Sequence, residues 1–251
     1  MSQIIATYVD HMGTDQRIID AARMSFSADD ILESKTRTDA QVLGLLNFLA
    51  RGTDSATWAD DLLTLEHGCG DADSAAKLLK EIRNRPIHWT PYAHTAITIV
   101  CSAPVSIRTQ AFKHQVGLTA NEESRRYIDA TPEYYIPEFR SRPTGSIKQG
   151  SGGIHHASGY WAKRYKQQCD AALDLYECMI SDGISPEQAR FVLPQGTIVN
   201  WVWTGNLYAF ANFYIARSDS HAQKEIQELA EQIDLILRPL FPKAWAALVD
   251  Q

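Results

Sequence analysis

The densest cluster of polar side chains lies in residues 108–127, RTQAFKHQVGLTANEESRRY. Side chains three or four positions apart share one face of a helix, so Gln110, Lys113 and His114 would point the same way if this stretch is helical. The following segment, expected to be a loop, adds amide, carboxylate, hydroxyl and guanidinium groups: Asn121, Glu122, Ser124, Arg125 and Arg126. Cations beside a hydroxyl and backbone N–H groups suit an anion such as phosphate. On composition alone, a solvated charged loop is an equally good interpretation.

Two further arginines stand next to apolar segments. Arg190 precedes the apolar run 191–193, and Arg217 follows an aromatic segment and opens the stretch 217–223, RSDSHAQ. Taken alone, Arg190 is more often an ordinary surface residue than an anion ligand. Asp219 or Ser220 is a good N-cap for the last helix, and that structural role can coexist with a function for this stretch.

The sequence lacks the common signatures of metal and nucleophile chemistry. It contains no H-E-x-x-H motif, no P-loop and no G-x-S-x-G motif, and its cysteines have no C-x-x-C spacing. Cys101 falls in an apolar run, so we expect a buried structural thiol rather than a nucleophile. His88 and His94 are, by themselves, more often structural than functional. We therefore predict no metal site.

The composition is that of an ordinary globular protein, with 45% hydrophobic and 22% charged residues among 251. The net charge of −6 argues against a duplex-binding module, which normally presents a basic face. The first residues lack the basic-then-apolar order of a leader peptide, and no apolar run approaches the roughly 20 residues that span a bilayer. We expect a cytoplasmic protein with reduced thiols and with no nucleic acid or membrane partner.

The periodicity of apolar residues predicts many helices and few strands. The expected strands cover residues 3–9 and 94–101, which are rich in β-branched side chains. Apolar stripes at helical spacing predict helices over 15–24, 42–52, 73–83, 104–115, 160–180, 199–216 and 222–238. Residues 27–39 and 145–153 are expected to be turn-like, the second as a mobile loop. Because strands and helices do not alternate regularly, the fold class is α+β.

These clusters occur together, and in the same order, in one family, the flavin-dependent thymidylate synthases, which this chain resembles. The family's Arg-His-Arg followed by Asn-Glu-x-Ser-x-Arg-Tyr corresponds to 113–115, KHQ, and 121–127, NEESRRY. Its other motifs resemble AARMSF at 21–26, HWTP at 88–91, ARFVLP at 189–194, NLY at 206–208 and the stretch 216–226. Each motif is weak alone, but their common order over most of the chain is a specific signal.

The chain departs from the family pattern where the family has arginines. Lys113 and Gln115 replace both arginines of Arg-His-Arg, and Tyr208 replaces the arginine of Asn-x-Arg. Lysine and glutamine cannot reproduce the planar bidentate contact that arginine makes with phosphate. Residues 27–72 and 142–155 also look like insertions.

The resemblance implies a single domain over residues 1–251, with a mostly antiparallel sheet flanked by helices, assembled as a homotetramer whose active sites form between subunits. It implies methylation of dUMP to dTMP, with FAD as cofactor and with methylenetetrahydrofolate and NADPH as co-substrates. Arg217 would be catalytic, facing the pyrimidine edge. The nucleotide would be held by Gln110, Glu122, Ser124, Arg125, Arg126 and Arg190. The flavin would contact Ser25, His88, Thr90, Lys113, His114, Gln115, Asn206 and Asn212.

The replaced arginines keep two alternatives open. One is a diverged enzyme that modifies C5 of a pyrimidine deoxynucleotide differently, by hydroxymethylation or with dCMP as substrate. The other is a nucleotide-binding relative that has lost catalysis. The aromatic segment 201–214 could pack near flavin or folate rings, although plain core packing is the more common role of such a stripe, and helices 199–216 and 222–238 could form a subunit interface.

Overall fold

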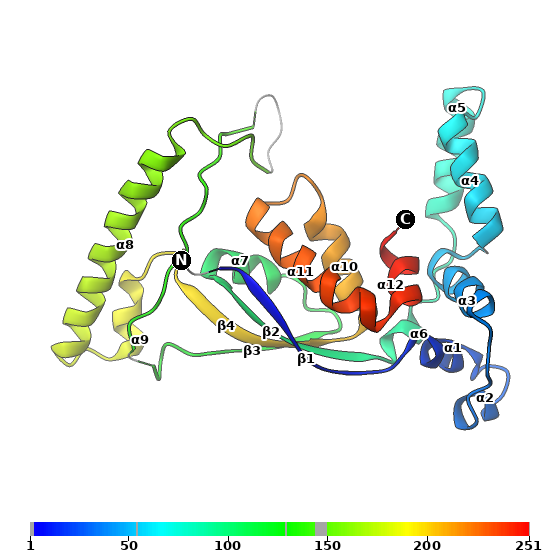
Figure 1. The fold of residues 1–251 in the computed structure, drawn as a ribbon, viewed down its shortest axis with the longest axis horizontal. Coiled ribbons are helices and arrows are strands. Elements are labelled where there is room, and N and C mark those ends of the chain that lie inside the picture. Colours follow the sequence, from blue (N-terminus) through cyan, green and yellow to red (C-terminus); the bar gives the residue numbers. More distant parts are fainter. Residues whose placement is uncertain (1–2, 54, 129, 144–149, 251) are drawn as a thin grey trace. The chain divides into compact units, whose positions relative to one another are not determined.

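A computed structural model describes residues 3–53, 55–128, 130–143 and 150–250 of the chain (Figure 1). The expected α+β class is confirmed: helices accompany a four-stranded antiparallel sheet with the strand order β1-β2-β4-β3. The strands are β1 (Ile5–Met12), β2 (Ala96–Pro104), β3 (Leu118–Glu122) and β4 (Ile198–Gly205). Part of the insertion predicted at 142–155 lies outside the described residues.

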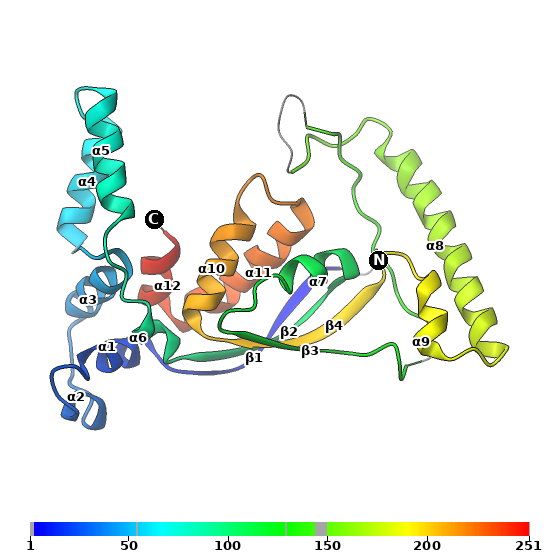
Figure 2. The ribbon, with the colours of Figure 1, turned by 180° about the vertical axis from the view of Figure 1, so that it is seen from behind.

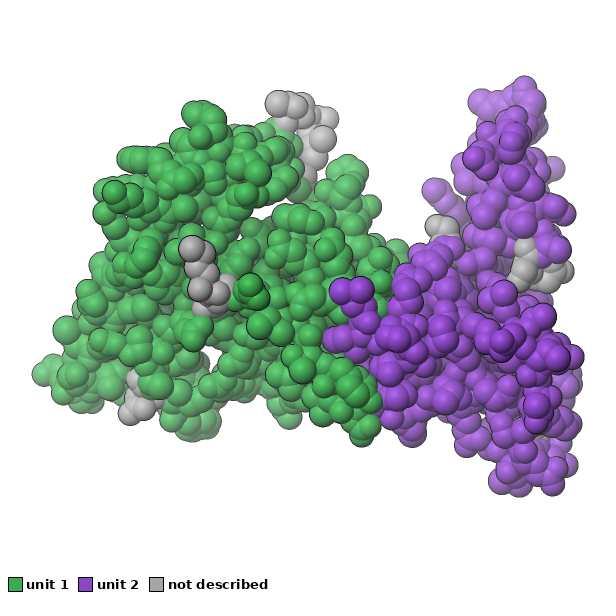
Figure 3. All heavy atoms as spheres, in the orientation of Figure 1, with its two compact units in different colours: residues 1–10, 98–204, 213–234 green, residues 11–97, 205–212, 235–251 purple. Residues whose placement is uncertain are grey.

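The chain divides into two compact units, each built from three separate stretches (Figure 3). The first unit comprises residues 1–10, 98–204 and 213–234, and the second comprises 11–97, 205–212 and 235–251. That the whole chain acts as one domain stays a prediction.

The first unit contains most of the sheet, the helices that follow β2 and β3, and parts of the two helices that follow β4. Along β2 the side chains alternate, and Ile99, Cys101 and Ala103 are buried, as expected for a strand rich in β-branched residues. Burial raises the pKa of the Cys101 thiol, which fits its predicted structural role. The helices here are α7 (Val105–Ala111), α8 (Ser158–Ser181), α9 (Pro186–Ala189) and the short 3-10 helix η1 (Arg190–Val192), and α8 packs against α9 and η1 (Figure 2).

The helix predicted over 199–216 is wrong in its first half. Residues Ile198–Gly205 form β4, and the helix α10 (Leu207–Ser218) begins only after Asn206. Trp201 and Trp203 are both buried because residues two positions apart lie on the same side of a strand. Apolar residues continue without a break into α10, so the strand and the helix looked like one helical stripe in the sequence. Asn206 marks the boundary, since its side-chain amide oxygen accepts the N–H of Ala209.

Other boundaries differ by a turn. The helix predicted over 104–115 ends at Ala111, so Lys113 and His114 lie in a turn, and the expected loop at Asn121 and Glu122 is the strand β3. The last predicted helix is α11 (Lys224–Leu240), which continues through Pro239 and is followed by α12 (Pro242–Val249). Asp219 and Ser220, predicted as N-caps of this helix, do not cap it, because α11 begins only at Lys224. The Asp219 carboxylate instead accepts the N–H of His221, two residues further along the chain.

The second unit consists mainly of helices. These are α1 (Asp15–Arg23), α2 (Asp29–Leu32), α3 (Asp39–Arg51), α4 (Ser55–His67), α5 (Ala72–Arg83) and α6 (Thr90–Ala93), with α12 packed against α1 and α3. Residues 27–39, expected to be turn-like, include the short α2. The Asp15 carboxylate accepts the N–H groups of Lys243 and Ala244 and so binds the start of α12 to α1. Among the described residues, no helix combines the length and apolarity that crossing a membrane requires.

A glycine at the end of α3 fixes the segment that leads to β2. Gly52 has a φ of +66°, and a Cβ atom there would lie 2.6 Å from the carbonyl oxygen of Pro86. The N–H of His88 donates to the carbonyl of Leu49 at 2.9 Å. The end of α3 therefore positions the segment that carries His88 and Thr90.

We expect Gly52→Ala to lower the free energy of unfolding by about 2–4 kcal/mol, because alanine is strained in the left-handed region and its methyl group would collide with a backbone carbonyl. Gly44→Ala is the matched control, since a Cβ there meets no atom within 4 Å in the middle of α3. It should stabilise the protein by about 0.5–1 kcal/mol. Urea unfolding of both variants measures the difference, and equal effects would contradict the role given to Gly52.

Candidate functional site

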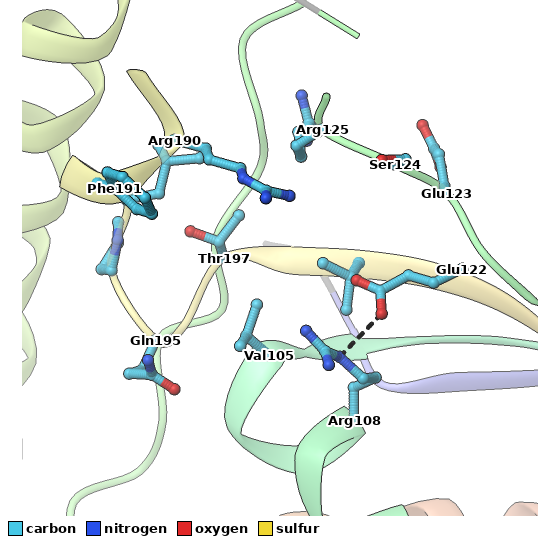
Figure 4. Close-up of a pocket in the computed structure, with 13 residues that line it drawn as sticks. Val105, Arg108, Glu122, Glu123, Ser124, Arg125, Arg190, Phe191, Gln195 and Thr197 are labelled. Atoms are coloured by element: carbon cyan, nitrogen blue, oxygen red, sulfur yellow. Dashed lines mark ion pairs between the residues drawn. The ribbon is translucent and has the colours of Figure 1, made fainter. Parts of the chain in front are cut away.

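The first unit contains a cavity of about 540 Å³ where the polar cluster predicted from the sequence meets the segment after α9. Figure 4 shows one wall formed by the end of β3 and the residues after it and an opposite wall formed by residues 190–197, with Val105 and Arg108 of α7 between them. The lining residues are Val105, Arg108, Glu122, Glu123, Ser124, Arg125, Arg190, Phe191, Leu193, Pro194, Gln195, Thr197 and Val199.

Of the residues predicted to hold a nucleotide, Glu122, Ser124, Arg125 and Arg190 line this cavity together. The turn formed by α9 and η1 brings Arg190 to it, and the Arg190 Nε donates to the carbonyl of Glu187 at 3.2 Å. Arg125 is held in a similar way, because its Nη1 donates to the carbonyl of Ala130 at 2.5 Å. Residues almost seventy positions apart in sequence thus share one cavity.

The other two predicted nucleotide residues do not line the cavity. Gln110 donates from Nε2 to the side chain of Gln223 at 2.7 Å. Arg126 is half-exposed and lies 3.4 Å from the Glu187 carboxylate through its Nε. Their assignment to the nucleotide stays a prediction.

Arg108 is a cavity residue that the sequence reasoning missed. Its Nε lies 3.1 Å from the Glu122 carboxylate, and both side chains are only about one-quarter exposed. Burial raises the pKa of Glu122, while Arg108 and then Arg190 act to lower it. Arg108 and Glu122 both belong to the polar cluster of residues 108–127, but their pairing depends on how α7 and β3 pack, which the sequence does not give.

The predicted catalytic residue Arg217 is oriented by hydrogen bonds to the polar cluster. Its Nε donates to His114 Nε2 at 3.0 Å, and its Nη2 donates to the backbone carbonyl of Gln110 at 3.4 Å. The His114 ring lies edge-on to Phe213, 5.1 Å between centroids. Because Nε2 accepts, the neutral ring carries its proton on Nδ1. Burial, and then the charge of Arg217, lower the pKa of His114 and favour this neutral form.

Residues 7–243 match the sequence profile of the family described as thymidylate synthase complementing protein. The chain belongs to this family. Its members are flavin-dependent, thymidylate synthase-like methylases.

Similar proteins cover most of the chain. The flavin-dependent thymidylate synthase of Pseudothermotoga lettingae is 25% identical over 241 residues, which span 96% of this chain and 88% of that protein. The one of Thermosipho africanus is 32% identical over 173 residues, spanning 64% and 72%. The crystal structure of the UMP/dUMP methylase PolB from Streptomyces cacaoi bound with 5-Br dUMP matches with a TM-score of 0.77 over 99% of this chain and 96% of that one, at 23% identity.

Residues predicted to contact the flavin are found in both units of this family member. In the first unit, Lys113 and Gln115 are exposed, and His114 and Gln115 border a smaller cavity of about 200 Å³ beside Phe112 and Trp203. Their assignment to the flavin stays a prediction.

In the second unit, the corresponding residues are mostly at the surface. Ser25, Thr90 and Asn212 are exposed. The His88 ring is stacked on Phe48 with 5.8 Å between centroids, so the region predicted to be inserted contributes a ring to this segment. The Asn206 amide oxygen is engaged at the start of α10.

Within the ranges that the structure describes, no group of three or more His, Cys, Asp or Glu side chains could hold a metal ion.

We expect Arg217→Gln to raise the pKa of His114 toward its ordinary value, because a neighbouring positive charge is removed while burial remains. NMR titration of the histidine ring measures this shift, and Arg140→Gln, which alters a guanidinium bound to the carbonyl of Gly152, is the control.

The same pKa predicts how stability depends on pH. The folded pKa of His114 is depressed, so its contribution is fully present above the ordinary value near 6.5 and is lost as the pH falls through the folded pKa. This decline in the free energy of unfolding should be shallower in Arg217→Gln. An unchanged His114 titration in that variant would show that Arg217 does not act on the ring.

Proposed function

We propose that this protein methylates dUMP to dTMP, with FAD as cofactor, methylenetetrahydrofolate as carbon donor and NADPH as reductant. One observation carries the proposal: Glu122, Ser124, Arg125 and Arg190, which match the nucleotide motifs of the family, border a single cavity. Family membership and the names of the relatives support the same reaction.

The cavity offers different chemistry to different parts of a nucleotide. The guanidinium groups of Arg125 and Arg190 and the Ser124 hydroxyl suit a dianionic phosphate, since charge-assisted hydrogen bonds are the strong ones. Glu122, held beside Arg108, suits a neutral donor such as a sugar hydroxyl. Phosphate at the Glu122 carboxylate would be repelled, so the two ends of the ligand are distinguished.

Arg217 supplies a fixed positive charge. Its hydrogen bonds to His114 and to the Gln110 carbonyl orient the guanidinium before a substrate arrives. A preorganised cation at the pyrimidine edge would stabilise the negative charge that develops on the ring as C5 becomes nucleophilic. Such a route needs no enzyme nucleophile.

Bound FAD would supply hydride transfer to the one-carbon unit. The predicted flavin residues carry hydroxyl, amide and imidazole groups, which fit the carbonyl and imide groups of a flavin ring, and Lys113 adds a cation suited to a pyrophosphate. By the family motifs, the residues that would hold it are Ser25, His88, Thr90, Lys113, His114, Gln115, Asn206 and Asn212.

A second candidate is methylation of UMP as well as dUMP. The structural relative from Streptomyces cacaoi is named a UMP/dUMP methylase, and its structures contain 5-Br dUMP or 5-Br UMP. The replaced arginines also keep two alternatives open: dCMP as the substrate, and a hydroxymethyl group as the one added at C5. We further propose a homotetramer in the cytoplasm that acts on small-molecule nucleotides rather than on nucleic acid or membranes.

The test is an assay of dUMP, UMP and dCMP, each with methylenetetrahydrofolate and FAD, with and without NADPH. We expect NADPH-dependent dTMP from dUMP. Product from UMP at a comparable rate would favour the second candidate, a hydroxymethyl product would favour the diverged enzyme, and nucleotide binding without any product would favour a non-catalytic relative.

We expect Arg190→Ala to weaken dUMP binding by about 1.5–3 kcal/mol, the usual value of a hydrogen bond to a charged group. Calorimetric titration measures the affinity. Arg164→Ala, which removes an exposed arginine bonded to Gln167 on α8, is the control and should bind dUMP normally. If both variants bind as the wild type does, Arg190 is not part of the site.

We expect Arg217→Ala to abolish dTMP formation while FAD binding stays close to that of the wild type, because this guanidinium is assigned to the pyrimidine rather than to the cofactor. Turnover and the flavin absorption bands after desalting give the two readouts. Loss of flavin from this variant would show that the role is assigned wrongly.

A further inference from the structure

Thr197 has a buried hydroxyl that no described group of the protein satisfies. The residue is 2% exposed, and its Oγ1 atom has no hydrogen-bond partner. Buried polar side-chain atoms nearly always have a partner, so an unpaired one needs an explanation. Thr197 also lines the 540 Å³ cavity, which makes a bound molecule the natural source of the partner.

The backbone holds Thr197 in place at this wall. Its N–H donates to the carbonyl of Pro194 at 2.9 Å, and its carbonyl accepts the N–H of Val105 at 3.0 Å. It also forms an antiparallel bridge with Tyr134. The backbone therefore keeps Thr197 at the cavity wall. Its Oγ1 atom has almost no accessible surface in the ligand-free protein, so the side chain must turn about χ1, between staggered positions, to bring the hydroxyl to a bound molecule.

The groups around the same cavity indicate what the hydroxyl meets. Arg125 and Arg190 each use one N–H on a backbone carbonyl, and a guanidinium has five such donors. Ser124 adds a hydroxyl. Figure 4 shows Thr197 on the wall that carries Arg190, opposite the wall that carries Glu122. An oxyanion fits a set of cations and hydroxyl donors, and between Arg190 and Arg125 it would be placed away from the Glu122 carboxylate. The second carboxylate of the lining, that of Glu123, accepts a hydrogen bond from the side-chain amide of Asn200.

We propose that the Thr197 hydroxyl donates a hydrogen bond to the phosphate of the bound nucleotide. Neither the nucleotide motifs nor the polar cluster of the sequence includes this residue. The identity of the ligand rests on the proposed function, whereas the oxyanion chemistry rests on the cavity itself. A phosphate monoester has enough acceptor oxygens to accept from Thr197, Ser124 and both arginines together.

The decisive variant is Thr197→Val, which keeps the β-branched shape and removes the donor. We expect its affinity for dUMP to fall about 10-fold and its affinity for deoxyuridine, which lacks the phosphate, to stay unchanged. The thermal midpoint of the ligand-free protein should stay equal or rise, because an unpaired buried hydroxyl has been removed. Thr197→Ser keeps the donor and should bind dUMP within about threefold of the wild type.

Thr98→Val is the matched control. The hydroxyl of Thr98 lies 3.0 Å from that of Thr204, so this threonine has a partner inside the protein. Its replacement should lower the thermal midpoint and leave dUMP affinity unchanged. The two threonines are thus expected to respond in opposite ways.

Several outcomes overturn the proposal: wild-type affinity of Thr197→Val for dUMP, an equal loss for dUMP and deoxyuridine, or a lowered thermal midpoint, which would mean that the hydroxyl is satisfied within the protein. A thermal-shift titration with inorganic phosphate separates this proposal from the proposed function. If phosphate stabilises the wild type but not Thr197→Val while dUMP does not bind, the oxyanion site stands and the nucleotide function fails. If neither ligand stabilises the wild type, the proposal for Thr197 is overturned.

Discussion

Like charges that face one cavity repel, and the arrangement of Arg108, Arg125 and Arg190 is built around that constraint. Each guanidinium has its own partner: Arg108 forms an ion pair with the Glu122 carboxylate, Arg125 donates to the Ala130 carbonyl and Arg190 donates to the Glu187 carbonyl. Acceptors from the backbone orient a charge without neutralising it. Uncharged carbonyls thus hold Arg125 and Arg190, whereas a carboxylate is paired with Arg108. The rest of the site depends on the segments that supply these acceptors.

Arg217 is likewise oriented by an uncharged acceptor, in this case a histidine side chain. A neutral histidine takes its hydrogen bond, and the charge of Arg217 itself helps to keep that histidine neutral. His114, the histidine of the family's Arg-His-Arg motif, thus orients Arg217 in this chain, although both arginines that flank it in the family are replaced. Tyr208, at the third replaced arginine, is paired with Trp89, their rings 5.8 Å apart, so an aromatic contact stands where a charge would have been.

The sequence predicted those parts of the site that lie close together along the chain. Glu122, Ser124 and Arg125 were found because they fall within one motif, and Arg190 because it opens another. Arg108 and Thr197 were not found, since their significance depends on which elements pack together. The same limit explains β4. Trp201 and Trp203 were assigned to a helix because apolar residues continue into α10, whose start is marked by hydrogen bonds from Ala209 to the Asn206 side chain and from Leu207 to the Thr95 hydroxyl. The helices of residues 15–23 and 39–51 were predictable because their caps and stripes are local.

The way the two compact units interleave has a consequence for synthesis on the ribosome. Each unit needs stretches from early, middle and late parts of the chain, and the second needs residues 235–251, where α12 packs against α1 and α3. Contacts between residues so distant in sequence form only after long loops close, which slows folding. A nascent chain would therefore present α1 and α3 without α12 until residues 242–249 have emerged from the ribosome. During that period chaperone binding or premature association competes with native packing.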